Sequence, residues 1–196
     1  MKVSLNLPPE WPVWRRLLIP AEFRLNQLHD ILQAAFGWLN SHLHEFRIGE
    51  RTCGRPDWQD HFEGEPQPED EPRVRLQSVF SETGSKAMYV YDFGDNWEHE
   101  ILFEGQQPRE AGKLYPFCAD GLGQCPPEDC GGAQEYEHFV RVMQDRFHPE
   151  YRELRRWLGR DFDPDEFSLD RVNRNLRAST RQRSQSRSEK APRMTN

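Results

Sequence analysis

Apolar and polar residues alternate along several short stretches of the chain, which is the pattern of strands that bury one face. Lys2–Leu7 and Val13–Ile19 alternate in this way, and prolines separate them. Between Lys86 and Phe103, two runs rich in aromatic and β-branched residues flank Gly94-Asp95. Two such runs around a glycine-containing turn predict a β-hairpin. We therefore expect a mainly antiparallel sheet with this hairpin at its centre.

Four segments have the repeat of about 3.6 residues that is typical of amphipathic helices. The clearest stripe runs from Leu25 to Phe36, with Asn26 as the expected N-cap and Gly37 as the expected residue after the helix. The other three segments are Gln134–Asp145, Pro149–Leu158 and Ser168–Leu176. Helices of this kind packed against an antiparallel sheet predict an α+β domain.

Three stretches follow neither pattern. Glu50–Arg73 is rich in proline and acidic residues and predicts a surface loop, and Gly105–Gly123 predicts a connector. Arg177–Asn196 is rich in Arg and Ser and has too few apolar residues to fold, which predicts disorder. The expected organisation is one domain over residues 1–176, followed by a disordered basic tail over residues 177–196.

Charge is distributed unevenly between these two parts. The chain of 196 residues has a net charge of −7, although its tail is basic. An acidic domain repels nucleic-acid phosphates, so contact with DNA or RNA is expected only through the tail. The sequence has no signal-peptide pattern and no apolar run of membrane-spanning length. We therefore expect a soluble, cytoplasmic protein without membrane contact, whose four cysteines are reduced thiols or ligands.

The turn of the hairpin carries more polar residues than a turn requires. If Asp92 lies opposite Trp97 and residues 93–96 form the turn, Asp92 and His99 fall on the same, otherwise apolar face. A buried Asp–His pair on such a face satisfies both polar groups and fixes the strand register. The alternative is a metal or proton-transfer site at the rim of the sheet.

A second candidate for metal chemistry is the motif HLHEF. Its His42 and His44 are two residues apart, so in a strand their rings emerge on one face and can share an ion. Together with Asp92 and His99 they form a candidate site for a divalent metal. The alternative is that one histidine caps a turn and the other lies on a partly exposed face.

The loop QCPPEDCGG at residues 124–132 presents two carboxylates between a stiff proline pair and a flexible glycine pair. Glu128 and Asp129 are candidate ligands or water-activating bases, or they form a latch by pairing with arginines. Zinc on Cys118, Cys125 and Cys130 is a weaker hypothesis, because their spacing is not that of a standard zinc finger.

Six short motifs occur in a recognisable order. They are WRR at 14–16, FGW at 36–38, HLHEF at 42–46, YVYDFGDNWEHEI at 89–101, CPPEDCGG at 125–132, and FDPDEF with a later VN between 162 and 173. In this order they resemble the plasmid pRiA4b ORF-3-like family, over about residues 2–176. The resemblance implies an α+β domain with an antiparallel sheet and no particular activity. Family members are associated by name with plasmids and insertion elements, and some are labelled resolvase-like or transposon passengers.

Two functional hypotheses remain. The first is a non-enzymatic binding or accessory module that recognises a protein or a small molecule. Its surface at the end of the sheet would be built from His42, Asp92, Asp95, Trp97, His99 and Glu128. The alternative is a metal-dependent hydrolase, acting for example on phosphoesters, with His42, His44, Asp92 and His99 as ligands. Recombinase chemistry is not supported, because Ser4 lies in a plain strand pattern without a cluster of arginines.

Overall fold

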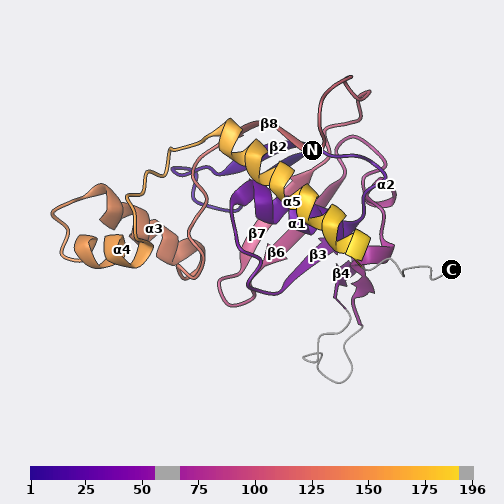
Figure 1. Ribbon diagram of the computed structural model, residues 1–196. Helices are drawn as coiled ribbons and strands as arrows, with labels where there is room; N and C mark the ends of the chain where they lie inside the picture. The colour runs from indigo at the N-terminus through magenta and orange to yellow at the C-terminus, as the bar shows by residue number, and fades with distance from the viewer. Residues whose placement is uncertain (56–66, 190–196) are drawn as a thin grey trace.

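The strands of the protein form one sheet around the predicted hairpin (Figure 1). The computed structural model describes residues 1–55 and 67–189. The strand order is β5-β4-β3-β6-β7-β1-β2-β8, and every pairing is antiparallel except that of β4 with β5. The strands are β1 (Lys2–Leu5), β2 (Trp14–Leu18), β3 (His44–Ile48), β4 (Arg51–Gly54), β5 (Glu69–Asp70), β6 (Lys86–Tyr91), β7 (Trp97–Leu102) and β8 (Phe117–Leu122). The α+β prediction with a central hairpin is confirmed.

Three strands lie where the sequence predicted loops. β4 and β5 fall inside the predicted loop Glu50–Arg73, and residues 56–66 of that loop lie outside the described residues. β8 falls inside the predicted connector Gly105–Gly123. β4 and β5 have only four and two residues, and Asp120 and Gly121 interrupt the apolar pattern of β8. The pairing of these strands therefore comes from neighbouring strands and not from a hydrophobic repeat. The side-chain amide of Asn173 accepts from the backbone N–H of Cys118 and donates to its carbonyl, both at 2.9 Å, and so anchors β8.

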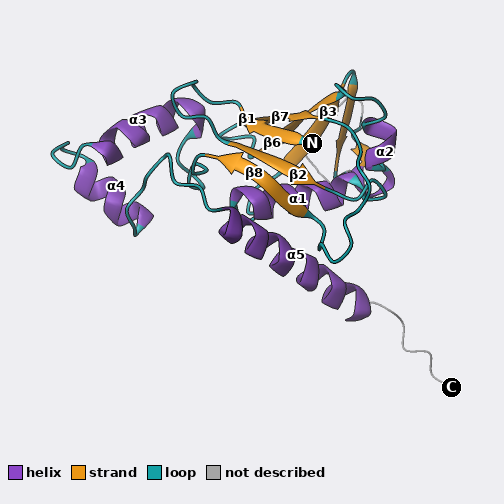
Figure 2. Cartoon of the chain, turned by 90° about the horizontal axis from the view of Figure 1, so that it is seen from above, coloured by secondary structure: helices purple, strands orange, loops and turns teal. Residues whose placement is uncertain are grey.

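The two faces of the sheet differ in composition. One face packs its large side chains against α1 (Leu25–Phe36), and α5 (Leu169–Glu189) lies over α1 and β8 (Figure 2). The opposite face carries surface ion pairs, such as Lys86 with Glu100 at 2.7 Å. One face therefore supplies the hydrophobic core, and the other is solvated, as is usual for antiparallel sheets.

The helices follow the predicted stripes, with changes at their ends. α1 is bounded by Arg24 in place of the predicted cap Asn26, and the side chain of Gln27 accepts a hydrogen bond from the Arg24 backbone N–H at 3.0 Å. Gly37 follows α1 with a φ of 84°, as predicted. α3 (Gly132–Gln144) and α4 (Tyr151–Leu158) form a pair that extends beyond the sheet (Figure 1), and short pieces at 71–73 and α2 (Leu76–Val79) complete the set.

The last helix is longer than the sequence predicted. α5 continues past the expected end at Leu176 to Glu189, so the first part of the predicted basic tail belongs to a helix. Leu176 and Val172 are buried, and they hold the N-terminal half of α5 against the domain. The prediction of disorder stays a prediction for residues 190–196, which lie outside the described residues. Within the described part of the chain, no helix has the length and apolar character needed to cross a membrane.

The register of the central hairpin differs from the predicted one by one residue. Tyr91, not Asp92, lies opposite Trp97, and Tyr89 lies opposite His99. The turn therefore contains five residues, 92–96, and not four. Because side chains alternate along a strand, this slip moves Tyr89 and Tyr91 onto the buried face and removes Asp92 from it.

Candidate functional site

Three loops meet at the turn end of the central hairpin. They are the segment before β3, the hairpin turn at 92–96 and the loop at 125–131. His42 lies between their carboxylates: its Nδ1 is 3.6 Å from Asp92 Oδ2, and its Nε2 is 3.4 Å from Glu128 Oε2 and 3.0 Å from Asp129 Oδ1. We call these four residues the turn-end cluster. The sequence named each of them as a candidate, and the fold brings them together.

Asp92 is held by the turn that it begins. Its Oδ1 accepts hydrogen bonds from the backbone N–H groups of Gly94 and Asp95, at 2.9 and 3.3 Å. Its own N–H donates to the Leu43 carbonyl at 2.8 Å, which ties the turn to the segment that carries His42. Asp92 has a φ of 57°, a conformation that Asp tolerates better than most residues. These contacts leave Oδ2 facing the imidazole.

The loop at 125–131 is docked onto the same turn. The Gly131 N–H donates to Asp95 Oδ2 at 3.0 Å. Gly132 has a φ of 81°, and a Cβ on it would lie 2.6 Å from the Asp95 carbonyl oxygen. Only glycine fits this close approach, which explains the second glycine of CPPEDCGG. Asp95 therefore positions the loop that carries Glu128 and Asp129.

Glu128 is the most firmly held carboxylate of the cluster. It accepts hydrogen bonds from the Leu39 N–H at 2.6 Å and from the Tyr91 hydroxyl at 3.1 Å. Burial and the Glu128 carboxylate raise the pKa of Tyr91 to about 12, so the hydroxyl stays protonated and donates. This role of Tyr91 was not predicted, because the predicted register placed its side chain on the other face of the sheet.

The cluster has the donors of a small divalent-metal site. Among the described residues, only His42, Asp92 and Asp129 form a group in which one ligand atom from each lies within 4.8 Å of the others. His42 Nε2 is buried and makes no hydrogen bond of good geometry, although two carboxylate oxygens lie close to it. An imidazole with carboxylates suits ions such as Zn²⁺ or Mn²⁺, whose bonds to these atoms are about 2 Å long. Asp129 faces Nε2 of the ring and Asp92 faces Nδ1, so an ion shared by all three residues requires a rotation of the imidazole or a movement of one carboxylate.

Comparison with known proteins places this fold and its motifs in a family. The family described as "Plasmid pRiA4b ORF-3-like protein" matches residues 1–171. The chain belongs to the plasmid pRiA4b ORF-3-like family. A curated relative, uncharacterized protein y4hQ of Sinorhizobium fredii, is 40% identical over 178 residues, which are 89% of this chain and 88% of the relative.

A solved structure has the same fold. The crystal structure of the protein of unknown function MM3350 from Methanosarcina mazei Go1 is 34% identical, with a TM-score of 0.74. The match covers 86% of this chain and 93% of that protein. The family motifs HLHEF, YVYDFGDNWEHEI and CPPEDCGG are the three segments that meet at the turn-end cluster. Three of the motifs that carry the resemblance thus come together at one place in the fold.

Two predicted ligands from these motifs lie elsewhere. His99 is fully buried and donates from Nδ1 to the Trp97 carbonyl at 3.0 Å, and its ring packs edge-on against Phe36 and Trp38. Burial lowers the pKa of His99 to about 3, so the ring is neutral. The predicted Asp92–His99 pair is wrong, because the register slip separates the two residues. Trp97 is 2% exposed and is a core residue, not part of a binding surface.

His44 belongs to a separate buried network. Its Nε2 lies 2.8 Å from Glu71 Oε2, and both side chains are buried. The ring of His29 stacks on that of His44, with centroids 3.5 Å apart, and bonds the Tyr89 hydroxyl at 2.8 Å. His42 precedes β3, so the prediction that His42 and His44 lie on one face of the same strand is wrong. Glu71 was missed because it lies in the proline-rich segment that predicted only a loop.

The remaining alternatives for the loop at 125–131 are now distinguishable. Glu128 and Asp129 face His42, Tyr91 and Leu39, so the predicted latch with arginines is wrong. The cysteines are free thiols, and burial raises the pKa of Cys130 to about 12. Within the described residues, the three thiols at 118, 125 and 130 do not form a metal-binding group, which argues against the zinc hypothesis.

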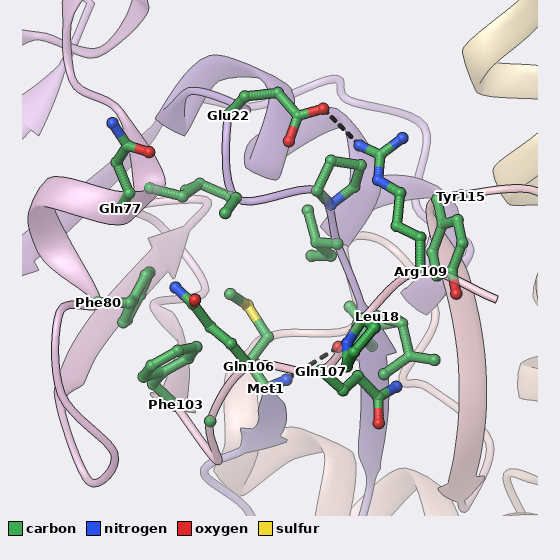
Figure 3. Close-up of a pocket in the computed structure, with 17 residues that line it drawn as sticks. Met1, Leu18, Glu22, Gln77, Phe80, Phe103, Gln106, Gln107, Arg109 and Tyr115 are labelled. Carbon is green, nitrogen blue, oxygen red and sulfur yellow. Dashed lines mark hydrogen bonds and ion pairs between the residues drawn. The ribbon is translucent and has the colours of Figure 1, made fainter.

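The opposite end of the hairpin has a pocket of different character (Figure 3). Its volume is about 220 Å³, and Met1, Phe80 and Phe103 line one side of it. Glu22 and Arg109 form an ion pair at its rim. The Met1 ammonium donates to the Leu17 carbonyl at 2.9 Å, and burial lowers its pKa. This pocket is mainly apolar and has no cluster of histidines and carboxylates.

Proposed function

We propose that this protein is a binding module that depends on a divalent metal ion held by His42, Asp92 and Asp129. The observation that carries the proposal is the convergence of one imidazole and two carboxylates from three separate loops. Glu128 borders the ion and fixes the loop by its bonds to Leu39 and Tyr91. An ion in this position links the three loops and offers its open positions to an anionic group of a partner or small molecule.

The charge of the cluster supports a cation as its ligand. Three carboxylates surround one imidazole, and Asp92 and Glu128 are 11% and 16% exposed. Like charges at this distance repel in a partly desolvated site, and a divalent cation relieves that repulsion. Asp129 is 69% exposed, so an ion has a route from solvent.

The test is metal binding by purified protein that has been stripped with a chelator. We expect calorimetry with Zn²⁺ and Mn²⁺ to give one site per chain, with affinity that falls as the pH is lowered, because metal ligands bind an ion in their deprotonated form. Saturating metal should raise the melting temperature, since the ion binds only the folded chain.

Matched variants localise the site. Asp129→Asn removes one ligand from an exposed position and should weaken binding at least about tenfold, as should His42→Gln. Asp165→Asn changes an exposed carboxylate outside the cluster and should bind as the unmodified protein does. The proposal fails if the stripped protein takes up no ion, or if all three variants bind equally.

Metal-dependent hydrolysis is a second candidate, and the position of Glu128 favours it. Its carboxylate lies beside the ligand set without belonging to it, where a base can take a proton from metal-bound water. The ligand set differs from that predicted from sequence, because His44 and His99 are not part of it. Hydrolysis of bis-p-nitrophenyl phosphate by the metal-loaded protein, lost in Asp129→Asn, would support this candidate. Metal binding without turnover would favour the binding module.

A further inference from the structure

A second cavity lies between the domain and the α3–α4 pair. Its volume is about 620 Å³, within the range of small-molecule sites. Its walls come from the end of α1, the loop at 124–128, the end of α4 and the first turns of α5. Of the turn-end cluster, only Glu128 lines this cavity, and the three residues of the proposed metal site do not.

The floor of this cavity contains a buried arginine. Arg15 is 4% exposed, and its guanidinium donates to four backbone carbonyls, including Ala35 at 3.1 Å and Leu122 at 2.7 Å. Within the described residues, no carboxylate lies at ion-pair distance from it. The four carbonyl groups hold the guanidinium in place, but their dipoles compensate its buried positive charge only in part. Burial lowers its pKa, which reflects this cost.

Two further guanidinium groups line the same cavity. Arg171, on α5, pairs with Glu166 at 2.9 Å and is half-exposed. Arg160 donates from both terminal nitrogens to the side-chain oxygen of Gln124, at 2.8 and 3.0 Å, when the amide is oriented to satisfy its neighbours. Three cations and two carboxylates, Glu128 and Glu166, thus line one cavity in a protein whose net charge is −7, so the lining has a net positive charge.

The other part of the lining is apolar and partly exposed. Trp157 is 49% exposed and Leu39 is 79% exposed, and both lie on the wall of the cavity. Phe167 lies under the Arg15 guanidinium, 4.8 Å from ring centroid to Cζ. Cationic and aromatic groups in one cavity are complementary to a ligand with an anionic head and an apolar body.

We propose that this cavity binds a small aromatic anion, whose phosphate or carboxylate group is held by Arg160 and Arg171 above the buried charge of Arg15. The ring of the ligand packs against Trp157 and Phe167. The proposal is independent of the metal site, since none of these residues belongs to the turn-end cluster.

Phenyl phosphate is a suitable probe, with inorganic phosphate and phenol as its two separate halves. Calorimetry on the protein in chelator should show saturable binding of phenyl phosphate, weaker binding of phosphate and none of phenol. The comparison of phenyl phosphate with benzoate then separates a phosphate from a carboxylate preference. Absence of saturable binding by both aromatic anions overturns the proposal.

Variants at exposed positions show where the probe binds without disturbing the buried Arg15. Arg171→Gln and Arg160→Gln should each weaken phenyl phosphate binding about tenfold or more, because each removes charge-assisted hydrogen bonds. Arg174→Gln, on the same helix but outside the cavity, should leave the affinity unchanged, as should Asp129→Asn in the metal cluster. Equal affinity in Arg171→Gln and Arg174→Gln overturns the assignment.

Discussion

The two ends of the central hairpin are built from different interactions. At the turn end, polar side chains hold three loops: Asp92 and Asp95 bind backbone N–H groups, and Glu128 binds Leu39 and Tyr91. At the open end, Phe80 and Phe103 line a largely apolar pocket. Apolar packing supplies stability, whereas loops held by hydrogen bonds can present titratable groups to a ligand. The difference places candidate chemistry at the turn and stability in the strands between the two ends.

The largest expected effect concerns the boundary between these regions, which lies at Trp97. This residue is adjacent to the turn but is 2% exposed and packs 6.5 Å from Tyr136 of α3, by ring centroids. Trp97→Ala should therefore lower the free energy of unfolding by about 3–5 kcal/mol, because it empties part of the core. Urea unfolding measures this loss.

The control for Trp97 lies in the turn itself. Phe93 is 41% exposed, and Phe93→Ala should cost less than about 1 kcal/mol. If Trp97→Ala and Phe93→Ala lower the free energy of unfolding equally, the boundary between the stable strands and the polar turn does not lie at Trp97.

The sequence predicted most of the elements and the members of the turn-end cluster, but it did not predict their partners. The stripe of α1 and the two runs of the hairpin are strong periodic signals, so their positions were predicted well. The register depends on the turn, where Asp92 and Asn96 both have positive φ, at 57° and 54°. Neither residue is glycine, so no local signal distinguishes a five-residue turn from the expected four-residue one.

This one-residue difference in register changed which side chains are neighbours in the candidate site. The predicted register joined Asp92 to His99, whereas the fold joins Asp92 to His42 and buries His99 beside Tyr89. Contacts between loops depend on such backbone details and on long-range docking, which one sequence does not reveal. The edge strand β8 was missed for a related reason, because it pairs with β2, which is distant in the chain. The strands β4 and β5 were missed because they are too short to show a repeat.

A second prediction tests whether the docking of the loop at 125–131 supports the turn-end cluster. Gly132→Ala places a Cβ 2.6 Å from the Asp95 carbonyl oxygen at a φ of 81°, so the loop must shift. We expect a loss of stability of about 2–3 kcal/mol together with weaker metal binding.

Gly37→Ala is the matched control for this loop. Its φ is 84°, but nothing lies within 4 Å of the added Cβ. It should cost only about 1 kcal/mol of backbone strain and leave metal affinity unchanged. Unchanged metal affinity in Gly132→Ala as well would mean that loop docking does not position the ligands.

The smallest expected effect is a pH dependence that arises in the strands and not in the turn-end cluster. The pKa of His99 is about 3 in the folded protein, below the ordinary value of about 6.5. Below pH 6.5 the unfolded chain therefore binds a proton that the folded chain excludes, and stability falls as the pH is lowered toward 3. At pH 5 the loss amounts to about 2 kcal/mol.

The variant His99→Phe removes this proton linkage. The difference in unfolding free energy between the unmodified protein and His99→Phe should change by about 2 kcal/mol from pH 7 to pH 5, in favour of the variant at the lower pH. Urea titrations at both pH values measure it. His138→Gln, at an exposed histidine paired with Glu150, should show a much smaller change. A difference for His99→Phe that does not vary with pH would mean that this ring is not a buried neutral group, and the strands would then share the titratable character of the turn.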